Sequence, residues 1–163
     1  MALQQKLDAL KKGFEAQAPN EVVEIMHRAT EDLKKSGILD GTVKVGDQAP
    51  DFSLKNADGQ EFSPKDLRSH GSDPGNQVTQ RYGLKFQLPE DLKEVYLNFD
   101  IDLPRYNGDD SWTLPLPTAL IIDQNGIIQH GAINADYTVR PDPEETVAAL
   151  RKIVEGKSQQ KPG

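Results

Sequence analysis

Cysteine is the residue type whose absence most restricts the chemistry open to this chain. None of its 163 residues is cysteine. Disulfide bonds, catalysis by a thiolate and thiolate metal sites are therefore excluded. Histidine and aspartate are the remaining residues whose spacing could build a metal site or an acid–base pair, and each group also has a purely structural interpretation.

The three histidines do not form a recognisable metal motif. His27, His70 and His130 fall on an expected helix, turn and strand, and no HxxxH or HxH pair occurs. Because a zinc site needs three or four ligands in a fixed geometry, the spacing favours isolated surface or core roles. We expect no bound metal and no cofactor.

Four aspartates lie around an Asn-Gly pair: Asp100, Asp102, Asp109 and Asp110. They lack the alternating ligands and the closing glutamate of an EF-hand calcium loop. Side chains that cap helices and turns in a solvated loop are the favoured interpretation. The Asp109-Asp110 pair has no second group opposite it, as hydrolytic acid–base catalysis would require.

The composition of the chain restricts the kinds of molecule that it can bind. Hydrophobic residues make up 36% of the chain and the formal net charge is -7, so we expect a small core and a surface that repels nucleic acid and anionic membranes. No stretch has the apolar run of a signal peptide or the roughly 20 apolar residues of a membrane span. A cytoplasmic location is expected.

Helical spacing of apolar residues predicts a hairpin of two helices over residues 1–37. Leu3, Leu7, Leu10 and Phe14 lie on one face of a helix over 2–17. Asn20 is the expected cap of the second helix, and Gly37 is its expected left-handed end. Two helices bury little surface alone, so we expect an arm or a dimerisation element.

The remaining elements follow from turn and capping signals. We expect a β-hairpin over 52–62, short helices over 64–67 and 76–82, and a helix over 90–99. A Pro- and Asp-rich loop over 101–117 follows, in which Trp112 either anchors a partner or, as we favour, packs the loop onto the core. The strongest β-hairpin signal lies over 118–133, with Asn125-Gly126 at its turn.

A capping signature starts the final helix. Asp142-Pro143 with Glu145 predicts its beginning, Gly156 its end, and 157–163 a disordered tail.

Several of these segments, in this order, resemble one family. Their sequences are MHRATEDLKKSGI, VGDQAPDFSLKNADGQEFSPKDL, SDPGNQVTQRYGLKFQLPEDL, IDLPRYNGDDSW and LPTALIIDQNGIIQHGAINADYT. They are similar to peroxiredoxin-like proteins of the AhpC/TSA family, in a bacterial subgroup with a thioredoxin-like fold. The resemblance implies an α/β fold, with a thioredoxin-like domain over 43–156 after the helical hairpin.

The same resemblance implies that a piece is missing. In that family a strand ending in a Trp-Cys-Pro-x-Cys type motif, followed by further strand and helix, separates the segments that here meet at Gly71–Ser72. The lost length is about two βα units, on the order of 60 residues. Reduction of a hydroperoxide needs a thiolate that cycles through sulfenic acid, so we expect no peroxidase activity.

The family's pocket implies four candidate site residues in this chain: Pro117, Thr118, Tyr137 and Arg140. Pro117 occupies the place of the family's cis-proline, and an ordinary trans proline at a strand start is the alternative.

Loss of the central strands leaves an exposed edge at Leu120, Ile121 and Ile122. We therefore expect either a homodimer, through the N-terminal helices as the favoured contact or through this edge, or a partly ordered chain. A non-catalytic interaction module is the alternative to an inactive family member. No group of residues supports an enzyme of unrelated mechanism.

Overall fold

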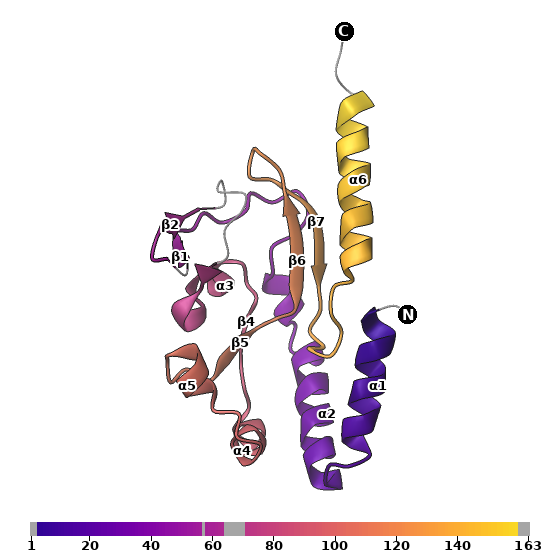
Figure 1. Ribbon diagram of the computed structural model, residues 1–163, viewed down its shortest axis with the longest axis vertical. Coiled ribbons are helices and arrows are strands. Elements are labelled where there is room, and N and C mark those ends of the chain that lie inside the picture. The colour runs from indigo at the N-terminus through magenta and orange to yellow at the C-terminus, as the bar shows by residue number, and fades with distance from the viewer. Residues whose placement is uncertain (1–2, 57, 64–70, 160–163) are drawn as a thin grey trace.

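Helices and three small antiparallel sheets make up the protein, as Figure 1 shows. The computed structural model describes residues 3–56, 58–63 and 71–159. The predicted α/β class is confirmed at this level. Among the described strands, all pairings are antiparallel and the three sheets are separate.

The N-terminal hairpin forms as expected. Helix α1 (Leu3–Glu15) and helix α2 (Asn20–Lys35) lie side by side. Gly37 adopts a φ of 76° and ends α2, as predicted. The predicted cap is wrong, because Pro19 holds the cap position and Asn20 is the first helical residue, without a side-chain capping bond.

The first sheet joins segments on both sides of the 64–70 region. Strand β1 (Leu54–Asn56) pairs with β2 (Glu61–Phe62), which confirms the predicted hairpin, and with β3 (Gly71–Ser72). The pairing of β3 was not predicted, since two residues carry no periodic signal. The helix expected over 64–67 and His70 lie outside the described residues.

The second sheet joins residues 85–87, for which no element was predicted, to residues 113–115 of the predicted 101–117 loop. Strand β4 (Lys85–Gln87) pairs with β5 (Thr113–Pro115), and α5 (Leu103–Asn107) lies within the expected 101–117 loop. That loop prediction is therefore wrong, because three-residue strands and a one-turn helix are too short to register as patterns. The helices predicted on either side of β4 are confirmed as α3 (Gln77–Arg81) and α4 (Glu90–Asn98).

The third sheet is the predicted hairpin of β6 (Thr118–Ile122) and β7 (Ile128–Ile133). Gly126 has a φ of 81°, as its turn requires. The segment 46–49 covers the start of β7 through two backbone hydrogen bonds. Gly46 N donates to Ile128 O at 2.8 Å, and Ile128 N donates to Asp47 O at 3.0 Å.

One edge of β6 has no strand beside it among the described residues. Along a strand, the backbone groups of successive residues point to opposite edges. Pro117 O accepts from Asn134 N on the β7 side, and Leu116 N donates to Leu84 O on the β4 side. The backbone groups of Thr118 and Leu120 therefore face the β4 side, beyond the end of that strand.

The last helix, α6 (Pro143–Gln159), begins as predicted but runs further. Asp142 caps it, with Oδ1 accepting from Glu144 N at 2.8 Å. Gly156 was expected to end the helix, but a glycine ends a helix when it turns left-handed, and Gly156 is not among the residues with positive φ. Residues 157–159 are helical rather than a disordered tail, and 160–163 lie outside the described residues.

Two hydrophobic clusters form the core. One surrounds Ile128 beneath the 118–133 hairpin. The other surrounds Leu88, and the residues packed on it include Met26 of α2 and Trp112. Trp112 therefore packs its loop onto the core, as favoured. Helix α2 packs on α4. Most of the apolar face of α2, which we expected to contact a second copy, therefore packs against residues of the same chain.

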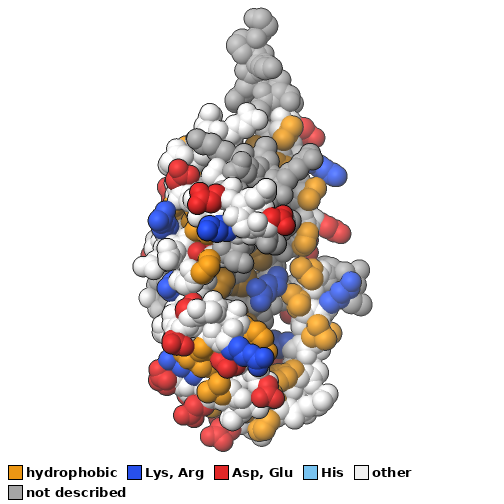
Figure 2. Space-filling view, turned by 60° about the vertical axis from the view of Figure 1, so that its left-hand side comes forward, with side chains coloured by type: hydrophobic (Ala, Val, Ile, Leu, Met, Phe, Trp, Pro, Cys, Tyr) orange, Lys and Arg blue, Asp and Glu red, His pale blue; other side chains and the backbone are white. Residues whose placement is uncertain are grey.

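The surface is charged with scattered apolar side chains. Figure 2 shows one face, on which acidic side chains gather toward the lower end. Exposed apolar residues occur on α1 and α6, where Leu10 is 71% exposed and Val154 is 55% exposed.

Candidate functional site

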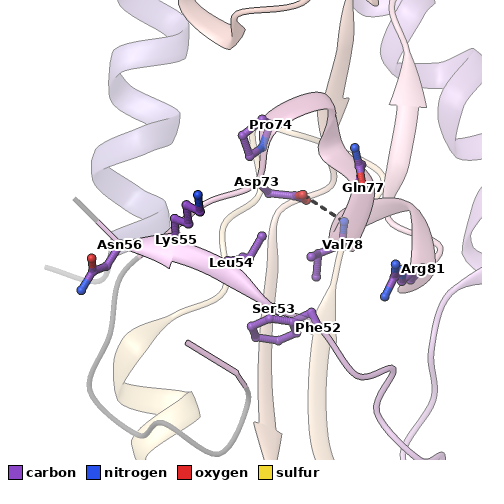
Figure 3. A pocket seen from close by; sticks show the side chains of 10 residues that line it. All are labelled: Phe52, Ser53, Leu54, Lys55, Asn56, Asp73, Pro74, Gln77, Val78 and Arg81. Atoms are coloured by element: carbon purple, nitrogen blue, oxygen red, sulfur yellow. Dashed lines mark hydrogen bonds between the residues drawn. The ribbon is translucent and has the colours of Figure 1, made fainter. Parts of the chain in front are cut away.

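A pocket of about 610 Å³ lies between β1 and α3, the elements on either side of the 64–70 region. Figure 3 shows its lining side chains, with Phe52 and Leu54 from the first segment facing Val78 from the second. Lys55, Gln77 and Arg81 supply polar groups to the same walls. The pocket brings together two stretches of chain, 52–56 and 73–81, that are separated by 16 residues in the sequence, so no local motif could have indicated it.

Asp73 is the carboxylate of this pocket, and it is already engaged. Its Oδ1 accepts from Val78 N at 3.0 Å, and its Oδ2 accepts from Thr79 N at 2.8 Å and from Thr79 Oγ1 at 2.9 Å. These bonds satisfy the first N–H groups of α3, which a helix start otherwise leaves without partners. Asp73 therefore fixes the turn and is not free to act as a base.

Two other polar side chains of the pocket, those of Asn56 and Arg81, are also engaged in hydrogen bonds. Asn56 Oδ1 accepts from Asp58 N at 3.0 Å and from Gln60 N at 2.9 Å, which closes the β1–β2 turn. Arg81 Nη1 donates to Asp51 O at 3.1 Å. Among the described lining residues none is cysteine, histidine or tyrosine. Ser53 contributes a hydroxyl group, which donates to Glu61 Oε2 at a long 3.5 Å. The described part of the pocket therefore offers surface for binding rather than a nucleophile held close to a base.

The four candidate site residues do not meet around this pocket. Pro117 is buried and Thr118 Oγ1 donates to Leu116 O at 3.0 Å. No peptide bond in the described residues is cis, so Pro117 is the ordinary trans proline. Arg140 lines a separate hollow beside the start of α6.

Tyr137 lies elsewhere, against the N-terminal helices. It lines two hollows, one with residues of α1 and α2 and one with residues of α2 and α4. Burial raises the pKa of its hydroxyl to about 12, and the hydroxyl has a side-chain hydrogen bond with Thr30.

Two of the four aspartates, Asp102 and Asp109, and one histidine, His27, have local partners, although Asp109 Oδ2 is buried without a hydrogen bond from any described residue. Asp102 Oδ1 accepts from Arg105 N at 3.2 Å and Asp109 Oδ1 from Ser111 N at 2.7 Å, as capping predicts. His27 Nε2 lies 2.7 Å from Glu15 Oε1. Within the described ranges, no three His, Asp or Glu side chains are grouped to hold a metal ion.

The sequence reasoning missed the contact between Glu15 and His27, although the helical hairpin gives a signal for it. Residues near the end of α1 and early in α2 must lie close when a short loop joins antiparallel helices.

Comparison with known proteins gives no assignment. No family model, curated protein or solved structure matches the chain. Among the described helices, none combines the length and apolar character needed to cross a membrane. Function is therefore argued from the residues and their geometry.

Proposed function

We propose that this protein is a peroxiredoxin-like (AhpC/TSA) chain with an incomplete thioredoxin-like fold, and that its function is non-catalytic self-association through the free edge of β6. The observation that carries the proposal is the β6 edge that no described strand pairs with, in a sequence without cysteine. The segments that resemble the family run in the same order along the chain and support its thioredoxin-like part.

The chemistry of sulfur supports the non-catalytic part. A peroxidatic thiolate attacks the O–O bond and becomes sulfenic acid, which a second thiol then reduces. Serine and histidine have no equivalent cycle, and this chain has no cysteine. The pocket beside the Gly71–Ser72 join, in which Asp73 holds the start of α3 and Asn56 closes a turn, agrees with a fold that has lost its redox centre.

The composition of β6 supports pairing. Its sequence TALII contains no charged residue and no proline, which are the features that usually protect an edge strand from pairing. Two copies related by a two-fold axis near Leu120 would place Thr118 of one copy opposite Ile122 of the other. The outward backbone groups of Thr118 and Leu120 then find donors and acceptors in the second copy.

The expected association is weak. A five-residue strand pair buries less area than a standard stable interface, so a dissociation constant of roughly micromolar or weaker follows. The exposed edge is favoured over the N-terminal helices as the contact, because α4 covers much of the apolar face of α2.

Sedimentation velocity over a wide range of protein concentration tests the association. We expect a concentration-dependent monomer–dimer equilibrium that Thr118→Pro weakens at least tenfold. Proline at this position removes an N–H that faces the free edge and leaves the β6–β7 hydrogen bonds intact. The matched control Thr118→Val keeps the N–H and should dimerise as the wild type does.

A wild type that stays monomeric up to roughly millimolar concentration would refute the β6 interface, given the affinity expected from its size. An unchanged dimer in Thr118→Pro would place the contact elsewhere.

A peroxide-consumption assay with a dithiol reductant tests the loss of redox chemistry independently. We expect the rate with protein to equal the rate of the protein-free blank. Turnover above that blank would overturn the argument from cysteine.

A further inference from the structure

A second cavity lies between α1, α2 and the loop that follows β7. Its volume is about 280 Å³, and its apolar walls are Leu10, Phe14, Val23 and Met26. Tyr137 and Thr30 contribute hydroxyl groups to the lining. Thr30 Oγ1 donates to Met26 O at 2.9 Å and is hydrogen-bonded to Tyr137, which leaves the Tyr137 oxygen able to accept a hydrogen bond from a ligand. The cavity is separate from the β6 edge and from the pocket beside the Gly71–Ser72 join.

The way in which α1 is attached explains why this cavity exists. No residue of α1 is buried, so the helix does not pack closely on the body. Polar contacts near both ends hold it instead, together with a contact between the rings of Phe14 and Phe99, whose centroids lie 5.7 Å apart. Gln4 Nε2 donates to Thr138 O at 3.2 Å near its start, and Glu15 Oε1 lies 2.7 Å from His27 Nε2 at its end.

The loop that carries Tyr137 is fixed before any ligand binds. Asp136 Oδ1 accepts from Thr138 N at 2.9 Å and from Thr138 Oγ1 at 2.6 Å. Tyr137 lies between these two residues, so its side chain is positioned by the loop. A pre-formed site loses less entropy when it binds a ligand than a site that must order itself.

The charges around the cavity are satisfied by one another. Glu15 contacts His27, and Lys11 Nζ lies 4.0 Å from the same Glu15 oxygen. A charged ligand would leave water for apolar walls without a free counter-ion, which is costly. The lining therefore favours an uncharged ligand.

The size of the cavity and the chemistry of its walls narrow the class of ligand further. An apolar cavity of about 150 Å³ is enough to hold benzene, so this cavity holds one ring with a short substituent. The rings of Phe14 and Tyr137 and the thioether of Met26 make favourable contacts with an aromatic ring.

We propose that the cavity between α1, α2 and Tyr137 binds a small uncharged aromatic molecule of the phenol class, with the ring between Phe14 and Met26 and the hydroxyl group hydrogen-bonded to Tyr137. This inference does not rest on the resemblance to peroxiredoxins or on association through β6.

Titration of the full chain with 4-methylphenol, followed by calorimetry, tests the site. We expect one molecule per chain with a dissociation constant of roughly 0.1 to 1 mM, in keeping with so few ligand atoms. Val23→Trp fills the cavity and should weaken binding at least tenfold. The control Val45→Trp places the same ring at a residue that is 63% exposed and does not line the cavity, and should leave binding within twofold of the wild type.

Tyr137→Phe separates the hydroxyl contact from the apolar walls. The variant should bind 4-methylphenol several-fold more weakly and toluene as tightly as the wild type does. Leu10→Asp, at a residue that is 71% exposed and therefore tolerant of change, should weaken both ligands by placing a charge at the walls.

The proposal is wrong if the wild type shows no saturable binding, or if Val23→Trp and Leu10→Asp both bind 4-methylphenol as the wild type does. It is also wrong if binding weakens as the protein concentration rises, since that result would mean that a second copy fills the cavity.

Discussion

At the scale of single residues, the side chains that look most reactive have structural roles. Asp73, Asp102 and Asp142 each accept hydrogen bonds from the first N–H groups of a helix. Asp123 holds the β6–β7 turn by accepting from Asn125 N and Ile127 N at 2.9 and 3.0 Å. Short acidic side chains are well suited to such local contacts, so their clustering in the sequence reflects turns more than chemistry.

A glycine at a close backbone approach gives the first prediction. Gly83 has a φ of 70°, and a Cβ atom there would lie 2.0 Å from Gly41 O. Gly83→Ala should lower the free energy of unfolding by more than about 2 kcal/mol, because backbone atoms must move and the conformation is strained. Urea denaturation measures the effect.

Gly13→Ala is the matched control for this prediction, because nothing lies within 4 Å of its added carbon. Gly13 is inside α1, so alanine should stabilise the protein by about 0.5 to 1 kcal/mol. Equal effects of the two substitutions would contradict the close approach at Gly83.

Tyr137 gives a prediction about pH. Burial raises the pKa of its hydroxyl to about 12 in the folded protein, against about 10 in an unfolded chain. Between these values the folded state holds the proton and the unfolded state does not, so stability falls as pH rises through this window. After allowance for partial exposure, the loss is about 1 to 2 kcal/mol.

Denaturation of the wild type and Tyr137→Phe between pH 9 and about 11 measures this loss as a difference between the two proteins. Parallel stability curves would show that Tyr137 titrates as an ordinary surface tyrosine.

At the scale of elements, the helices and sheets differ in how firmly they are held. The β6–β7 hairpin carries Ile128, which is 1% exposed. Helix α1 has no buried residue and is held by the polar contacts of Gln4 and Glu15. Exposed hydrogen bonds of this kind contribute little to stability, so the two elements should open at different free energies.

Native-state hydrogen exchange tests this difference. The amides of α1 should exchange with lower protection than those of β7, because no residue of α1 is buried whereas β7 carries the buried Ile128. Gln4→Ala should lower the protection of α1 further and leave β7 unchanged. Equal protection of α1 and β7 in the wild type would mean that α1 unfolds only with the whole protein.

At the scale of the whole molecule, two hydrophobic clusters share residues. Phe86 of β4 packs against both the cluster around Ile128 and the cluster around Leu88. Helix α2 contributes Leu33 to the first and Met26 to the second. These shared side chains couple the N-terminal helices to the sheets, so we expect one cooperative unfolding transition.

The single tryptophan makes this coupling measurable. Trp112 reports on the cluster around Leu88, whereas Ile128 belongs to the other cluster. Ile128→Ala should cost about 2 to 5 kcal/mol and shift the unfolding transition seen by Trp112 fluorescence as far as the one seen by circular dichroism. A Trp112 transition that does not move would mean that the two clusters unfold separately.

The sequence determined the local structure of this protein and one chemical limit. Periodic apolar residues and glycine or proline signals predicted α2, α4 and the β6–β7 hairpin, because the interactions that specify them involve residues close in the chain. The absence of cysteine excluded thiol chemistry without any structure. The beginning of α6 was predicted correctly from its capping residue. Its end was not, because a glycine inside a helix does not by itself end the helix.

The tertiary structure decided what the distant segments build together. Pairing of β3 with β1 and of β4 with β5 rests on backbone hydrogen bonds, which carry no side-chain signal and join residues far apart in the chain. The position of Tyr137 between α1 and α2 likewise depends on how the loop after β7 returns to the first helices. Non-local contacts of this kind depend on the packing of the whole chain, which no short stretch of sequence contains.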